Sequence, residues 1–99
     1  GGTAPVDANG KTVGIGNAAK QAERCFEIID DALQRAGSGW ADVVRTRVIL
    51  TNINDWKAVI NVRAKYCKEA KPVDTIMQVT RFVNPEWLVE IDATAVIPD

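Results

Sequence analysis

Three carboxylates in the last third of the chain are the side chains best placed to do chemistry. Glu90 and Asp92 are two residues apart in a β-rich run, so they project from one face of a strand. Asp74 lies in the preceding β-rich run, on the parity that we assign to the same polar face. If Asp74 and Glu90 share a cleft, their pKa values are pushed apart, and the pair suits a cationic or hydroxylated small molecule. The alternative is that both acids pair with Arg45, Arg47 or Arg81 and have only a structural role.

Arg63 is the one cation in the apolar stripe of a predicted helix. One interpretation is an arginine at the edge of the stripe, with its stem buried and its head in water. The other is a cation that lines a pocket. Histidine is absent from the sequence, which excludes His-based triads, His general bases and His metal ligands.

Composition limits the partners. The 99 residues carry a net charge of −1, with a pI near 5.4, so no basic surplus predicts nucleic-acid binding. No apolar run approaches the roughly 18 residues of a membrane span, and the N-terminus lacks a signal-peptide pattern. We therefore expect a cytoplasmic protein that binds neither nucleic acid nor membrane. Cys25 and Cys67 are predicted to be reduced core thiols, although a disulfide between them stays open.

Five elements must position these side chains. Asn17 is a plausible N-cap and Gly37 a plausible C-terminal glycine for the clearest helix, and Pro72 ends a second one. Alternation of apolar and polar residues predicts three strands. The expected helices are 17–36 and 55–68, and the expected strands are 43–51, 73–82 and 88–97. The prediction is an α+β fold, a two-layer sandwich of one mixed sheet with two helices on one face.

Parity divides the side chains of this sheet into two sets. The first set, with the apolar stripes of the helices, is the predicted core: Ala22, Phe26, Ile29, Leu33, Val44, Val48, Trp56, Ile91 and Ala93. The second set lies on the opposite face of the sheet: Arg45, Arg47, Asp74, Gln78, Glu90 and Asp92, with Ile49, Ile76 and Leu88. The second face is too mixed for solvent and too charged for a core, so we expect self-association through it.

Three segments in this order and spacing resemble the Rid (YjgF) superfamily of small trimeric proteins: GGTAPVD, ADVVRTRVILTNINDW and LVEIDATAV. The resemblance covers nearly the whole chain and implies a chorismate-mutase-like fold, with residues 1–99 forming a single domain. It also implies a homotrimer. Members usually carry one or two further N-terminal strands, so we expect such strands to be missing before Gly1.

The best-known activity of this family is the hydrolysis of enamine or imine intermediates such as 2-aminoacrylate, without a cofactor. The resemblance implies a pocket between subunits, where an arginine holds the substrate carboxylate and a glutamate positions water. Carried over by position, the glutamate is Glu90, and Asp74 stands where the arginine is usual. Gly1 stands where a serine is usual, and Ile60 where an asparagine is usual. We include Ile76 and Arg63 among the ligand-binding candidates, and we expect no metal site.

The change from arginine to aspartate reverses the charge that would hold a substrate carboxylate. We therefore expect weak or absent 2-aminoacrylate activity. One hypothesis is a hydrolase or deaminase of an imine-like or other small metabolite with altered specificity. The second is a ligand-binding or interaction module that has lost catalysis. An endoribonuclease or translation inhibitor ranks last, because the chain has no histidine and no basic patch.

Overall fold

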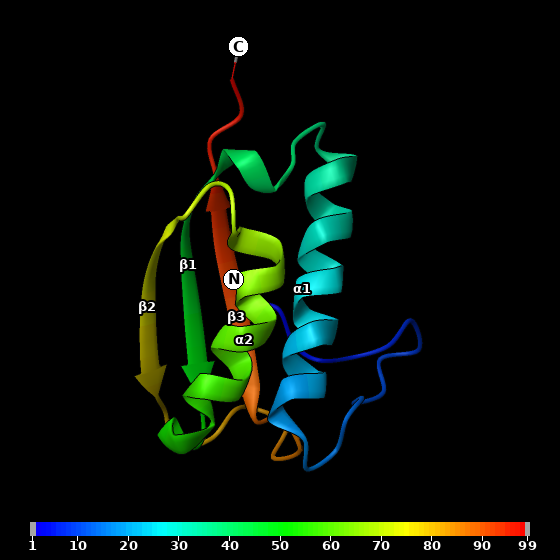
Figure 1. Ribbon diagram of the computed structural model, residues 1–99. Helices are drawn as coiled ribbons and strands as arrows, with labels where there is room; N and C mark the ends of the chain where they lie inside the picture. The colour runs from blue at the N-terminus through cyan, green and yellow to red at the C-terminus, as the bar shows by residue number, and fades with distance from the viewer. Residues whose placement is uncertain (1, 99) are drawn as a thin grey trace.

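The computed structural model describes residues 2–98, which form two layers (Figure 1). The sheet has the strand order β2-β1-β3, with β1 (Val43–Leu50) parallel to β2 (Val73–Gln78) and antiparallel to β3 (Val89–Ala95). Helices α1 (Ala18–Arg35) and α2 (Trp56–Cys67) lie on one face of this mixed sheet. The predicted α+β sandwich is confirmed.

Local signals fix both ends of α1. The Asn17 side chain accepts a hydrogen bond from the backbone N–H of Lys20 at 3.0 Å, which caps the first turn. At the other end Gly37 has a φ of 74°, and the N–H of Ser38 reaches back to the carbonyl of Leu33 at 2.8 Å. This pattern satisfies the last free carbonyls of the helix and favours glycine at its turning point.

The core lies between the helices and the inner face of the sheet. Its buried members are Ala18, Ala22, Cys25, Phe26, Ile29, Val48, Leu50, Val59, Val62, Val89 and Ile91. Leu33 and Ala93 pack against this cluster while partly exposed. Seven of the nine predicted core residues therefore lie in the core or against it, and the predicted stripe of α1 is confirmed.

Val44 was predicted in the core and is 48% exposed. The register between β1 and β3 shifts between Val43 and Arg45, so Val44 is an extra residue opposite the partner strand. Such a bulge changes the alternation, and Val43 is buried in place of Val44.

Trp56 was also predicted in the core, and it is 41% exposed. It is the first residue of α2, and a helical side chain covers the turn on the N-terminal side of its own Cα. The Trp56 ring therefore extends past the start of the helix, where Lys57 Nζ lies 5.7 Å from its centre. The buried residues of α2 are Val59, Val62 and Cys67.

The face assigned to β2 was wrong. In the parallel register Thr46 pairs with Asp74 and Val48 pairs with Ile76. Paired residues share a face, and Thr46 and Val48 are fully buried beneath the helices. Asp74 and Ile76, with Gln78, thus lie on the helix side, whereas Val73 is 68% exposed on the outer face.

The segment before α1 lies beside β3. Thr3 forms an antiparallel bridge with Ile91 of β3, with backbone hydrogen bonds of 2.7 and 3.2 Å. Cys25 and Cys67 are both buried and free, as expected of core thiols. Among residues 2–98, no helix is both long and apolar enough to cross a membrane.

Candidate functional site

Glu90 lies on the outer face of β3, directly across from Ile49 of β1. Its side chain is half-buried, and partial removal from water raises the pKa of its carboxyl above the ordinary value. No ion pair among residues 2–98 includes Glu90. A carboxyl group of raised pKa is suited to take up and return a proton.

The backbone of Gly2 lies against the Glu90 carboxylate. A Cβ atom built on Gly2 would come within 2.4 Å of Glu90 Oε1, which is closer than real contacts allow. Glycine at position 2 therefore makes the room that the carboxylate occupies. The bridge between Thr3 and Ile91 holds this segment beside β3, so the fold itself places Gly2 there.

Two neighbouring charges on this face pair with each other. Arg47 of β1 lies opposite Asp92 of β3 and donates from Nε to both carboxylate oxygens, at 3.1 and 2.9 Å. Its Nη2 also donates to Asp92. These hydrogen bonds raise the pKa of the Arg47 guanidinium. Arg47 is thus occupied by Asp92, and Glu90 carries the uncompensated charge beside it.

A second polar cluster lies on the opposite face of the sheet, beneath α2. The Thr46 hydroxyl donates to Asp74 Oδ1 at 2.7 Å and accepts from Arg63 Nε at 2.9 Å. Arg63 Nε also lies 3.6 Å from Asp74 Oδ2, and Nη2 donates to the carbonyl of Pro72 at 2.9 Å. Arg63 and Asp74 therefore form an ion pair at the edge of the sheet formed by β2.

The predicted site residues fall into two groups. Asp74 and Arg63 form the ion pair, and Ile60 and Ile76 pack partly buried against the core on the same side of the sheet. Glu90 lies on the other side of the sheet, so Asp74 and Glu90 do not share a cleft within one chain. The arginine that pairs with Asp74 is Arg63, not Arg45, Arg47 or Arg81 as the structural alternative expected. Gly1 lies outside the described residues.

Two residues that the prediction missed complete these groups. Gly2 lies against Glu90, and no sequence signal marks that contact. Thr46 has the same parity as Val44 and Val48 in its strand, although it is polar. Thr46 lies in the apolar parity of β1, and Arg63 lies in the apolar stripe of α2. Buried polar groups need hydrogen-bonding partners, so these two residues together were a detectable signal of a contact between them.

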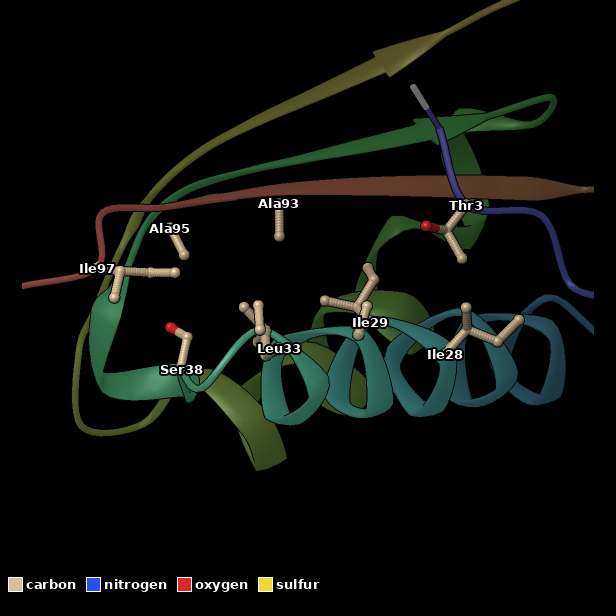
Figure 2. Close-up of a pocket in the computed structure, with 10 residues that line it drawn as sticks. Thr3, Ile28, Ile29, Leu33, Ser38, Ala93, Ala95 and Ile97 are labelled. Carbon is tan, nitrogen blue, oxygen red and sulfur yellow. The ribbon is translucent and has the colours of Figure 1, made fainter.

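Two cavities lie away from both groups. One, of about 230 Å³, runs between α1 and β3 and is lined mainly by aliphatic side chains. Figure 2 shows Ile29 and Leu33 of α1 lying across from Ala93 and Ala95 of β3. Another, of about 350 Å³, lies beside Trp40 and Tyr66. Neither includes Glu90 or Asp74, and residues 2–98 hold no cluster of three His, Cys, Asp or Glu side chains that could bind a metal.

Two helices on one face of a mixed sheet, with this strand order, define a YjgF-like domain, and solved structures share it. The structure of Rv2704 from Mycobacterium tuberculosis, of the YjgF/YER057c/UK114 family, is 34% identical with a TM-score of 0.85. The match covers 98% of this chain and 75% of that one. Residues 1–97 match the family model described as Endoribonuclease L-PSP. The chain belongs to this family, within the Rid (YjgF) superfamily.

Sequence relatives agree. A RutC family protein of Synechocystis is 39% identical over 87 residues, which are 87% of this chain and 66% of the relative. The 3-aminoacrylate deaminase RutC of Acinetobacter baylyi is 34% identical over 94 residues, which are 95% of this chain and 74% of the relative. The chain thus spans about two thirds to three quarters of the length of these relatives.

Proposed function

We propose that this protein forms a homotrimer with small-molecule sites between its subunits. At these sites it hydrolyses an imine-like metabolite without a cofactor, with a specificity that differs from 2-aminoacrylate. Similarity to a 3-aminoacrylate deaminase supports chemistry of the deaminase type. Two unpaired cysteine thiols suit a reducing compartment, and we place the reaction in the cytoplasm.

The observation that carries the proposal is the division of the site between two sides of one sheet. We call Glu90 and Gly2 the acid half-site, and Arg63, Asp74, Ile60 and Ile76 the β2 half-site. A single chain keeps them apart, so a site that contains both requires a second copy. Two different surfaces that meet head to tail form a ring when the rotation closes, and a trimer is such a ring.

The outer face of the sheet supports an interface. Val44 and Val73 expose 48% and 68% of their surface there, and Ile49 lies next to Glu90 across the strands. Exposed apolar side chains that cluster on one surface mark contact sites. Association through this face would cover them and would remove further water from the Glu90 carboxyl.

Glu90 is the proposed acid–base group. Its carboxylate takes a proton from a water molecule while the water oxygen bonds to the imine carbon. The same proton then passes to the nitrogen, which gives a tetrahedral intermediate with one hydroxyl and one amino group. Glu90 next takes the hydroxyl proton and delivers it to the nitrogen as the C–N bond breaks, which yields a carbonyl compound and ammonia. The raised pKa of Glu90 supports both steps, because the group must accept a proton and then release it.

Activity toward 2-aminoacrylate is expected to be weak or absent. Asp74 stands where a cation would have to meet the substrate carboxylate. The loss of such an ion pair costs roughly 3–5 kcal/mol, which is about two to four decades in kcat/KM.

A ligand-binding module without catalysis is the second candidate. The observation in its favour is the ion pair of Arg63 and Asp74, which occupies polar groups that a substrate would otherwise contact. RNA cleavage ranks below both candidates, although the matched family model is described as Endoribonuclease L-PSP, because the net charge is −1 and the sequence has no histidine.

Sedimentation velocity at micromolar concentration tests the assembly. We expect a species of three times the chain mass of 10.8 kDa, and a monomer would contradict the proposal.

Ammonia release from a panel of small imines tests the chemistry, with Glu90→Gln as the probe variant. Glu86→Gln is the matched control, because Glu86 is exposed in the loop before β3. Loss of turnover with Glu90→Gln alone supports catalysis, whereas binding without turnover in the wild type supports the module.

A further inference from the structure

Asp74 places a carboxylate beside the guanidinium of Arg63, and the Thr46 hydroxyl bridges the two side chains. One of its oxygens accepts a hydrogen bond from Thr46 at 2.7 Å, and the other lies 3.6 Å from Arg63 Nε. Only 15% of the Arg63 side chain and 16% of the Asp74 side chain are exposed. Two opposite charges that are mostly buried and share Thr46 form a compensated unit.

The guanidinium nevertheless reaches solvent. Among the described residues, none accepts a hydrogen bond from Nη1 of Arg63, whereas Nε and Nη2 each have an acceptor. No fully buried polar side-chain atom there is without a partner, so Nη1 must contact solvent. A small molecule at the edge of the sheet can therefore reach an N–H donor whose charge is already balanced.

We propose that Asp74 is a built-in substitute for a ligand carboxylate, and that the β2 half-site selects small carbonyl or imine compounds that lack one. The pair of Arg63 and Asp74 is thus the specificity determinant, and this inference rests on the proposed function for the site itself. A neutral ligand accepts a hydrogen bond from Nη1 and leaves the pair intact.

A carboxylate ligand meets two obstacles. It must lie close to Asp74, whose like charge repels it, or it must displace Asp74 and leave that carboxylate without its cation. In the assembled site Glu90 of the second copy adds another negative charge. Removal of the Asp74 charge should therefore uncover an anion site at Arg63, although no new cation is introduced.

Two small molecules of matched shape test this charge preference. Pyruvate carries a carboxylate, and pyruvamide carries a neutral amide in its place. Titration of the ¹⁵N-labelled protein, followed by amide chemical shifts, gives the Kd of each. We expect the wild type to bind pyruvamide more tightly than pyruvate. In Asp74→Asn the affinity for pyruvate should rise about tenfold or more, the size of one charge-assisted hydrogen bond.

The gain must depend on Arg63. The double variant Asp74→Asn with Arg63→Gln should lose it, whereas Asp31→Asn is the matched control. Asp31 pairs with Arg35 at 2.9 Å on the exposed side of α1, so this change also frees an arginine, but in full contact with water. If Asp74→Asn does not fold, Asp74→Ser keeps a polar group beside Thr46 and supports the same comparison.

Tighter binding of pyruvate by the wild type, or no gain in either Asp74 variant, would overturn the inference. Failure of the proposed function gives a different result. In that case pyruvate binds Asp74→Asn through Arg63, but the amides of Glu90 and Gly2 do not shift, because no second copy completes the site.

Discussion

Glu90 depends on the backbone beside it, because Gly2 leaves the space that its carboxylate fills. Gly2→Ala should displace the carboxylate and weaken ligand binding and turnover to nearly the level of Glu90→Gln. The melting temperature should change little, since only the end of a flexible side chain must move. Parallel melting and binding measurements on Gly2→Ala and Glu90→Gln check this. Unchanged binding by Gly2→Ala would show that the position of the carboxylate does not matter.

The ionisation of Glu90 should also make stability depend on pH. Burial raises its pKa in the folded state, so the folded protein holds this proton more tightly than the unfolded chain does. The resulting stability is complete below the ordinary pKa of 4.5 and is lost as the pH rises through the folded value. We expect the difference in unfolding free energy between wild type and Glu90→Gln to change in that window. Equal pH profiles for the two proteins would contradict the assignment.

At the residue scale, the sequence predicted the face of the sheet on which Glu90 lies but not its surroundings. Its own strand has one clearly apolar parity, so its face was predictable. In β2 both parities contain apolar residues, and only pairing of Asp74 with Thr46 places it beneath the helices. The register of β2 against β1 depends on residues far apart in the sequence, so the local pattern of β2 does not predict it.

At the scale of elements, the end of α1 offers a matched pair of glycines. Gly37 has a φ of 74°, whereas Gly39 has a φ of −168°, and neither would bring a Cβ near another atom. Gly37→Ala should cost about 1–2 kcal/mol, because only the first position requires a left-handed backbone. Gly39→Ala should cost nothing or stabilise slightly. Urea unfolding of both variants measures the change in the free energy of unfolding. Equal losses in the two variants would contradict the requirement for a left-handed backbone at the end of α1.

Phe26 tests the packing of α1 on the rest of the core. It is fully buried, and its ring centre lies 5.1 Å from that of Tyr66 and 5.7 Å from that of Trp40. Phe26→Ala should cost roughly 3–5 kcal/mol, because it leaves a cavity in this aromatic cluster. Val83→Ala is the control, since Val83 is 90% exposed. A urea midpoint unchanged by Phe26→Ala would show that α1 packs through another face.

The elements themselves were well predicted, since periodicity, the Asn17 cap and Gly37 are local. The errors occurred where the chain departs from a regular element. The bulge at Val44 exchanged one valine for another in the core, and Trp56 lies where α2 begins. Both strands near the C-terminus are shorter than predicted: β2 ends at Gln78 and β3 at Ala95. The end of a strand depends on where its partner strand ends, and the sequence of one strand alone does not show this.

At the scale of the whole molecule, the proposed function requires a second copy. The acid half-site lies on the outer face of β3, and the β2 half-site lies on the helix side at the opposite edge of the sheet (Figure 1). In a monomer, Glu90 would have no ligand-binding groups beside it, and the ion pair of Arg63 and Asp74 would have no acid–base group beside it. In the proposed trimer, head-to-tail association would bring the two half-sites together at every interface, and each subunit would contribute to two sites.

A cross-saturation experiment tests this assembly most directly, and it needs no knowledge of the ligand. Deuterated ¹⁵N-labelled chains are mixed with unlabelled chains under conditions that exchange subunits, and the aliphatic protons of the unlabelled copies are saturated. If the proposed trimer forms, we expect intensity losses at two sets of amides, around Glu90 on β3 and around Asp74 on β2. Losses at only one of these sets, or at neither, would contradict a site built from both.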